Sequence, residues 1–244
     1  MLSNQILTIP YGVITDSLGV FLGGFLGCLL KNKLPHKLRS SLPVIFGIVS
    51  MAMGVTAIQK VNCFPAVVLA VIAGYILGTI LGLEYLVNQA IIKICTLIVK
   101  DNNEKEDLTS YMDILFGIVP LFCVSGTGIF GTMHSRFTGD HSILFVKTIL
   151  DFCTSMMFGA LLGSIVSFIA IPQFCIMAIV FFISGFLLPI TTSEMLLDFT
   201  ACGGIIMLAT GLRISQIKSI STSNLLPSFI LVMPLSQLYR WFLG

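Results

Sequence analysis

Long apolar runs separated by short polar segments make up most of this 244-residue chain. A helix that crosses a bilayer needs roughly 20 mostly apolar residues, and runs of about this length recur throughout the sequence. We therefore expect an all-α fold, a polytopic transmembrane helical bundle of about eight spans, or seven, in a single integral membrane domain over residues 1–244. The expected spans are 5–30, 41–59, 65–86, 112–133, 142–171, 172–190, 195–213 and 224–243.

Two places between these runs have a distinct pattern. At Ile171-Pro172 one apolar run ends and the next begins, and because proline disfavours helix in the residue before it, we expect a turn there. Between 87 and 111, apolar residues recur at helical spacing and are followed by the acidic run 101–107. This pattern predicts a cytoplasmic amphipathic helix on the membrane interface and then a solvated loop, for which a plain connector is favoured over a regulatory role.

The composition agrees with a membrane protein. Charged residues make up 10% of the chain and the mean hydropathy is +1.03, whereas a soluble domain carries about 25% charged residues. The net charge of +2 gives no indication of a nucleic-acid partner. The seven cysteines form no C-x-x-C pair, so we expect buried thiols and neither a metal nor a cofactor.

The basic residues predict an orientation. Four positive charges lie within residues 31–39, and such short basic loops usually remain in the cytoplasm, which places the N-terminus outside. Residues 1–10 contain no basic residue, so we do not expect a cleavable signal there.

Glycines recur every four residues in two of the expected spans. In lipid no hydrophobic force brings helices together, so small residues at this spacing allow close backbone contact. This contact could form within one chain or between subunits of a homo-oligomer. The predicted helix-packing glycines are Gly19, Gly23, Gly27, Gly74, Gly78 and Gly82.

Four charged residues inside expected spans bear on function, because a charge near the bilayer centre costs at least ~2.5–3.5 kcal/mol. One of them, Asp198, lies near the start of its span and could be interfacial, so it carries less weight. Lys147 and Asp151 are four residues apart, which places them on one helix face within ion-pair reach. Asp16 has no cation nearby in sequence, so it must find one across helices, find water or be protonated. The pair Lys147–Asp151 could be a neutralising pair that tolerates burial. The alternative is that these residues and Asp16 line an ion or substrate path.

The fourth expected span contains three glycines and three hydroxyl residues within residues 125–132. Because glycine weakens a helix, we expect either a discontinuous helix whose backbone groups bind an ion or a glycine-rich packing face. The residues assigned to such a path are Ser125, Gly126, Thr127 and Gly128. The polar segment 134–141 that follows is expected to be an extracytoplasmic loop. There His134, Asp140 and His141 could form a site, although an ordinary surface loop is favoured.

Parts of the sequence echo one another. Asp16-x7-Gly24 resembles Asp151-x7-Gly159, and Gly47-x6-Gly54 resembles Gly204-x6-Gly211. These matches suggest a duplicated unit with repeat halves 1–86 and 142–244. With eight spans, the first pair of helices would run parallel and the second antiparallel, so one duplication does not account for both matches.

Three stretches carry a family resemblance. They are the glycine-rich opening at 12–27, the stretch from Phe122-Cys123 to Lys147 and Asp151, and the late glycines 203, 204 and 211 with Asn224-Leu-Leu-Pro227. Over nearly its whole length the chain resembles the bacterial membrane proteins grouped as domain of unknown function 554, the YqgA-like family. The resemblance implies a bacterial cytoplasmic (inner) membrane protein, but no substrate or site. That family usually has asparagine at the position of Asp16, and a small or amide residue at that of His134.

These observations favour a transporter or channel for an ion or small solute. The alternative is a membrane assembly or sensing protein without flux. We do not expect an enzyme, because the sequence has no H-E-x-x-H or G-x-S-x-G motif. The expected partners are the lipid bilayer and the transported ion or solute.

Overall fold

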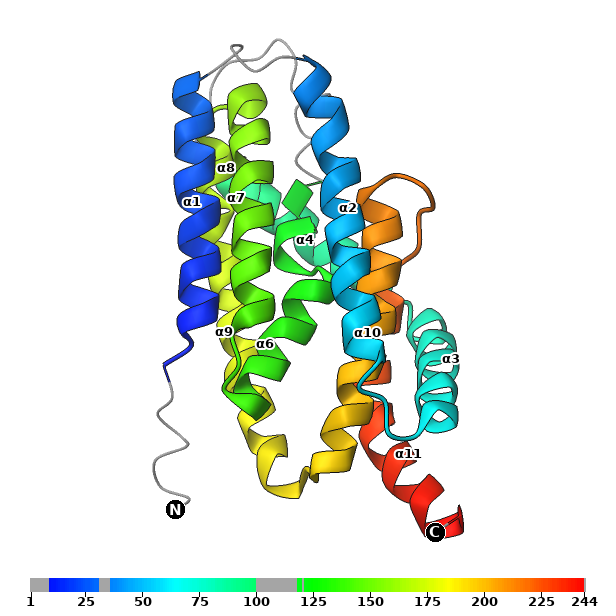
Figure 1. Ribbon diagram of the computed structural model, residues 1–244. Coiled ribbons are helices and arrows are strands. Elements are labelled where there is room, and N and C mark those ends of the chain that lie inside the picture. Colours follow the sequence, from blue (N-terminus) through cyan, green and yellow to red (C-terminus); the bar gives the residue numbers. More distant parts are fainter. Residues whose placement is uncertain (1–8, 31–35, 100–117, 120, 244) are drawn as a thin grey trace. The chain divides into compact units, whose positions relative to one another are not determined.

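The computed structural model describes residues 9–30, 36–99, 118–119 and 121–243 (Figure 1). Within these ranges the chain is helical and contains no strand, as the sequence predicts. The acidic run 101–107, the basic residues Lys31 and Lys33 and the start of the fourth expected span at 112–117 lie outside the described residues.

The chain divides into two compact units. Unit 1 contains residues 1–34 and 131–190, and unit 2 contains residues 35–130 and 191–244. The division falls within helix α6 (Gly126–Thr138), between Phe130 and Gly131.

Unit 1 is built around two parallel helices, α1 (Tyr11–Leu30) and α7 (Ser142–Leu162) (Figure 1). Gly12, near the start of α1, faces Leu144 near the start of α7, and Gly27 near the end of α1 faces Met156. The chain then continues through the short helix α8 (Ile165–Phe168), α9 (Ala170–Leu187) and the 3-10 turn η2 (Leu188–Ile190). Val13, Leu144 and Met177 form a buried apolar cluster in which all three long helices meet.

Backbone contact at glycine holds α1 against α7. A Cβ on Gly19 would lie 2.8 Å from the Thr148 methyl group, and one on Gly23 would overlap the Phe152 carbonyl oxygen. At Gly27 it would overlap the carbonyl oxygen of Met156. The expected four-residue glycine spacing thus lies along the α1–α7 contact, where any larger side chain would force the helices apart.

Unit 2 contains α2 (His36–Ile58), α3 (Phe64–Ile80), α4 (Leu83–Val99), α10 (Ser193–Ile214), the 3-10 turn η3 (Ser223–Leu225) and α11 (Ser228–Leu243). Helices α2 and α10 pack antiparallel, because a Cβ on Gly47 would lie 2.5 Å from the Gly211 carbonyl oxygen and one on Gly54 2.6 Å from that of Gly204.

Helix α3 packs on η3 and α11 through two of the expected glycines. A Cβ on Gly74 would lie 2.6 Å from the Ser228 backbone nitrogen, and one on Gly78 would overlap the Asn224 carbonyl oxygen. Nearby, the rings of Phe130, Phe199 and Phe229 lie with centroids 5.4–6.0 Å apart and form the aromatic core of unit 2.

Gly82 differs from the other glycines predicted to pack. A Cβ there would meet nothing within 4 Å, and its φ is +63°, which favours glycine. It lies between α3 and α4, where the chain bends by 61°. The role of Gly82 is therefore to permit this bend rather than a close helix contact.

Two boundaries also differ from the expectation. Helix α7 ends at Leu162, because Gly163 has φ +79°, and the turn expected at Ile171-Pro172 is found slightly earlier, at Ile169, where α8 ends and α9 begins. Pro172 instead lies in the first turn of α9, where its missing N–H leaves no intrahelical hydrogen bond unmade.

The fourth span has a break at Val124–Ser125, after helical residues at 121–123, which agrees with the discontinuous helix that was one of the two alternatives. Beyond it, α6 continues to Thr138, so the expectation of a loop beginning at His134 is wrong. Residues 134–138 are helical, Gly139, with φ +75°, ends the helix, and Asp140 and His141 connect it to α7.

Five helices in the described ranges are long and apolar enough to cross a bilayer, or up to six if the bent pair α3–α4 counts as one span. Seven or eight spans are not confirmed. The 13 residues of α6 and the 16 of α11 are shorter than the roughly 20 that a complete span requires.

The echoed sequence motifs meet in space within each unit. A Cβ on Gly159 would overlap the Gly24 carbonyl oxygen, and the pairs Gly47–Gly211 and Gly54–Gly204 lie in similar contact. The first helix pair is parallel and the second antiparallel. Packing of small residues against small residues therefore accounts for the echo, and duplication of the halves 1–86 and 142–244 stays a prediction.

Candidate functional site

A cluster of four polar side chains lies in unit 1 among α1, α7 and α9. Asp16 and Gln173 are 0% exposed, Lys147 is 3% exposed and Asp151 is 8% exposed. All three helices are long and apolar enough to cross a membrane. We refer to these four residues as the buried cluster.

The three charged residues of the buried cluster are in direct contact. The Lys147 ammonium donates to Asp16 Oδ2 at 2.9 Å and also to Asp151 Oδ2, one turn along α7. The amide of Gln173 donates to Asp16 Oδ2 at 2.7 Å and to Asp151 Oδ2 at 3.3 Å. One lysine and one glutamine thus bridge both carboxylates.

Packing of α1 on α7 explains why Asp16 reaches Lys147. The two residues are 131 positions apart in the chain. Gly12 and Gly19 flank Asp16 on α1, and they contact Leu144 and Thr148, which flank Lys147 on α7. Because the helices run parallel at backbone contact, the aspartate and the lysine come to the same level.

The buried cluster has more acceptors than donors. With all groups ionised, two carboxylates and one ammonium leave a formal charge of −1. Two of its oxygens, Asp16 Oδ1 and Gln173 Oε1, are buried and have no hydrogen-bond partner among the described residues. Leaving a buried acceptor unpaired costs about 1–3 kcal/mol, and more for a charged group. A proton or small cation bound at Asp16 Oδ1 would lower the cost of leaving this oxygen unpaired, and this is the chemistry that the arrangement permits.

Two further hydroxyls extend this polar region. The Oγ atoms of Ser17, next to Asp16, and Ser167, in α8, are buried and also lack a partner in the described chain. A Cβ on Gly24 of α1 would lie 2.8 Å from Ser167 Oγ, so this hydroxyl packs directly on α1. Buried polar groups therefore lie on or against α1 at two levels, at Asp16 and Ser17 and again opposite Gly24, in a segment that is otherwise apolar.

Unit 2 contains a buried carboxylate of a different kind. Asp198 in α10 is 0% exposed. Its Oδ1 accepts from the backbone N–H groups of Asn62 at 2.9 Å and Cys63 at 2.6 Å, and its Oδ2 accepts from Ser236 at 2.5 Å. Both oxygens are satisfied, and the charge lies at the N-terminus of α3, where the helix dipole favours an anion. This environment is typical of a structural carboxylate.

The predicted path residues of the fourth span lie in unit 2 at the start of α6. The Ser125 hydroxyl caps the helix by accepting from the Gly128 backbone N–H at 3.0 Å. A Cβ on Gly126 would lie 2.5 Å from Ile206, and the Thr127 hydroxyl lies 3.4 Å from that of Ser50. The contacts of Ser125 and Gly126 are those of a capped and tightly packed helix start.

The residues expected to form an extracytoplasmic loop site occupy different environments. His134 is 6% exposed within α6, and its Nδ1 lies 3.3 Å from the Thr138 hydroxyl. Asp140, in the turn, accepts from the Ser142 backbone N–H, and His141 precedes α7 with its ring edge-on to Tyr11. In the part of the chain that the structure describes, no three His, Cys, Asp or Glu residues are placed to hold a metal ion.

The sequence did not indicate the buried polar contacts of two residues, Gln173 and Asp198. Gln173 carries no charge and follows directly after Pro172, which was interpreted as a turn between spans. The signal that could have identified it is a lone amide within a long apolar run. Asp198 was interpreted as interfacial because it lies near the start of its span, and only its contacts show that it is buried.

The comparisons agree with the sequence and the fold. Residues 11–237 match the family described as "Protein of unknown function (DUF554)". The chain is 42% identical over 232 residues to "Uncharacterized protein YqgA" of Escherichia coli (strain K12), which covers 95% of this chain and 98% of that protein. It is 25% identical over 225 residues to "Uncharacterized membrane protein YdfK" of Bacillus subtilis (strain 168), covering 91% of this chain and 93% of that protein. No solved structure matches.

This is a membrane protein, because it has several apolar helices of membrane-spanning length and a relative that is named as a membrane protein. The match over residues 11–237 shows that it belongs to the DUF554 family.

Proposed function

We propose that this protein is a transporter or channel for an ion or small solute, and that a proton is the ion handled at the buried cluster. One observation supports this above the others. Among the residues that the structure describes, Asp16 Oδ1 and Gln173 Oε1 are acceptors without donors, and they lie inside helices of membrane-spanning length. Ionisable residues at such positions usually line an ion or solute pathway.

The comparison with Asp198 strengthens the proposal. A carboxylate retained for folding alone is expected to have its oxygens satisfied, as those of Asp198 are. Asp16 instead shares Lys147 with Asp151, and one of its oxygens has no partner within the described part of the chain. The surplus of acceptors is what a site that binds and releases a proton requires.

The chemistry follows from the charges. A proton bound at either carboxylate changes the formal charge of the buried cluster from −1 to 0 and supplies one O–H donor. Lys147 would then be attracted mainly to the carboxylate that is still ionised. Uptake and release of the proton would therefore shift Lys147 between Asp16 and Asp151, which lie on different helices. Such a shift couples proton binding to the contact between α1 and α7.

The experiment is a flux measurement on purified protein in liposomes that contain a pH-sensitive dye. An imposed pH gradient should dissipate faster than in empty liposomes. Asp16→Asn and Asp151→Asn remove the carboxylates at constant size, and we expect each to reduce proton flux at least about tenfold. Asp140→Asn is the matched control, because it removes an exposed carboxylate of the same unit and should leave flux unchanged.

The result that would overturn this assignment is equal flux in wild type, Asp16→Asn and Asp151→Asn, at equal reconstituted amounts. If wild type shows no flux for protons, other cations or anions, the alternative of an assembly or sensing protein without flux gains support. Monodisperse elution in detergent should be checked for each variant, so that loss of folding is not counted as loss of transport.

The proposal includes a location. We propose the bacterial cytoplasmic membrane with the N-terminus outside, on the basis of the positive charges at residues 31–39. Reporter fusions at the two ends of α1 test this orientation, because a reporter that is active only in the periplasm should work before Tyr11 and fail after Leu30.

A further inference from the structure

Helix α11 carries two large aromatic side chains on the surface of unit 2, close to its C-terminal end. Trp241 is 78% exposed and Phe242 is 69% exposed, and their rings lie edge to face with centroids 5.0 Å apart. We refer to these two residues as the aromatic end. A tryptophan or phenylalanine ring gains much free energy when its apolar surface leaves water, so the surroundings of the two rings decide what covers them.

The start of α10 lies beside the aromatic end. Arg240 directly precedes Trp241, and its Nη1 lies 3.1 Å from Glu194 Oε2 in the first turn of α10. Its Nη2 donates to the Thr192 hydroxyl at 3.3 Å. Thr192 in turn caps α10, because its hydroxyl accepts from the Met195 backbone N–H. The polar first turn of α10 is therefore at the level of Trp241.

The connection between α2 and α3 reaches nearly the same level. The backbone N–H groups of Asn62 and Cys63 donate to Asp198, which lies one turn further into α10. The Ser236 hydroxyl, one turn before Arg240 on α11, donates to the same carboxylate. The end of α2 and the start of α3 thus lie within about one to two helical turns of the end of α11.

The polarity of this end of unit 2 places it outside the hydrocarbon core of a bilayer. Gln59, Lys60 and Asn62 are exposed and lie in the non-helical connection after α2, and Thr192 is exposed before α10. Exposed backbone without helical hydrogen bonds does not occur in the hydrocarbon region, because its N–H and C=O groups would have no partners there. The exposed ammonium of Lys60 is excluded from this region for the same kind of reason.

An exposed tryptophan at such a level has one favourable environment. Its ring is apolar and its N–H is polar, so it is most stable between the lipid headgroups and the acyl chains, where tryptophan and tyrosine are enriched. Ile230, which is 67% exposed, precedes Trp241 by 11 residues, or about 16 Å along α11. The exposed surface of α11 therefore leads from an aliphatic side chain to an amphipathic ring.

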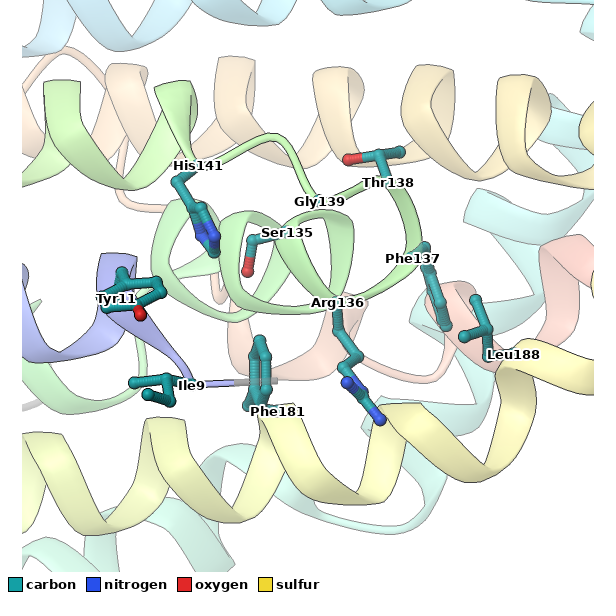
Figure 2. A pocket seen from close by; sticks show the side chains of 10 residues that line it. All are labelled: Ile9, Tyr11, Ser135, Arg136, Phe137, Thr138, Gly139, His141, Phe181 and Leu188. Atoms are coloured by element: carbon teal, nitrogen blue, oxygen red, sulfur yellow. The ribbon is translucent and has the colours of Figure 1, made fainter. Parts of the chain in front are cut away.

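Unit 1 has a comparable residue at a helix end whose position is fixed by span length. Helix α1 has 20 residues and is apolar enough to cross a membrane. It begins with Tyr11, which is 57% exposed and is labelled in Figure 2. A complete span of this length has its first residue near the boundary of the hydrocarbon core. An exposed aromatic ring thus occupies this boundary in unit 1 as well.

We propose that the aromatic end of α11 is a membrane anchor that binds the boundary between lipid headgroups and acyl chains. Because Arg240 is paired with Glu194, contact of the rings with lipid and not attraction of a free charge holds the anchor. We therefore expect it to bind zwitterionic and anionic bilayers alike. The inference is independent of the proposed function, since it uses neither the buried cluster nor flux.

Trp241 is the only tryptophan of the chain, so its fluorescence reports on this site without a label. Purified protein is reconstituted into phosphatidylcholine liposomes in which part of the lipid carries bromine, a contact quencher, either near the headgroup or near the end of the acyl chains. We expect the shallow bromine to quench Trp241 at least about twofold more than the deep bromine. The control combines Trp241→Phe with Ile230→Trp, which moves the single tryptophan about 16 Å along α11 and should reverse the order.

Several results would overturn the anchor. Stronger quenching of Trp241 by the deep bromine would place the ring in the hydrocarbon core. Weak quenching by both lipids would mean that water or protein, such as a second copy of the chain, surrounds the ring, and aqueous acrylamide distinguishes these two cases. Equal shallow quenching of the tryptophans at 230 and 241 would contradict the path of α11 towards the boundary.

Lipid charge provides a further test. Addition of phosphatidylglycerol should leave the shallow quenching of Trp241 unchanged. A shallow pattern that forms only with phosphatidylglycerol would assign the contact to charge and overturn the role of the rings. If the variant with tryptophan at 230 does not elute as a monodisperse protein, the comparison of shallow and deep bromine on wild type remains decisive.

Discussion

Lys147 of α7 donates a hydrogen bond to Asp16 of α1 at 2.9 Å, across 131 residues of sequence. The same ammonium donates to Asp151, and both carboxylates accept from Gln173. Because one ammonium pairs with two buried aspartates, neither carboxylate has a full counter-charge. This relationship distinguishes the buried cluster from an isolated neutral ion pair.

Replacing Lys147 by methionine should strongly destabilise the protein. It leaves two buried carboxylates without their cation, and breaking a buried pair typically costs about 3–5 kcal/mol. The triple variant Asp16→Asn, Lys147→Met, Asp151→Asn should recover much of the loss, because all charges are removed together. Thermal unfolding in detergent, followed by circular dichroism, measures both. A triple variant less stable than Lys147→Met would contradict the charge argument.

Gly23→Val should separate α1 from α7. A Cβ on Gly23 would overlap the carbonyl oxygen of Phe152, which cannot rotate away as a side chain could. Overpacking of this kind costs about 1–3 kcal/mol or more. The unfolding temperature in detergent should fall, and if it matched that of wild type, the close contact between these helices would be refuted.

Gly82→Asn should be tolerated, in contrast to Gly23→Val. Nothing lies within 4 Å of a Cβ at Gly82, and asparagine accepts positive φ better than most residues. We expect a cost of at most about 1 kcal/mol, measured by the same unfolding assay. A loss as large as that of Gly23→Val would show that Gly82 has a packing role after all.

Asp198→Asn should reduce stability without reducing transport per folded molecule. The carboxylate accepts three hydrogen bonds, two of them from backbone N–H groups at the start of α3. Loss of the charge should cost about 1–3 kcal/mol. Proton flux, normalised to monodisperse protein, should equal that of wild type. If flux were abolished in well-folded Asp198→Asn, the distinction drawn between structural and functional carboxylates would fail.

Ser125→Ala should cost about 1 kcal/mol, the usual value of a helix N-cap. Its hydroxyl accepts from the Gly128 N–H at 3.0 Å after the break at Val124–Ser125. Thr127→Val is the control, because within the described residues its hydroxyl makes a long 3.4 Å contact with Ser50, which should matter less. Chemical unfolding of both variants compares them, and equal losses would argue against a specific cap.

Several features of this protein followed from the sequence because they depend on local physics. Long apolar runs predicted membrane helices, since a bilayer requires a minimum length. The spacing of Lys147 and Asp151 predicted their ion pair, because residues four apart share a helix face. The dense glycines and hydroxyl residues of the fourth span left two alternatives, and the break at Val124–Ser125 agrees with the discontinuous helix.

Other features were decided by the tertiary structure alone. Asp16 needed a cation from another helix, and which helix depended on the parallel packing of α1 on α7. Gln173 and Asp198 acquired their roles only through contacts with residues distant in sequence. His134 lies in a helix although its segment is polar. Gly82 permits a bend although its spacing matches that of the packing glycines. Hydropathy and spacing constrain each helix by itself, whereas partners, direction and register arise when the helices pack, and these determine which polar groups meet.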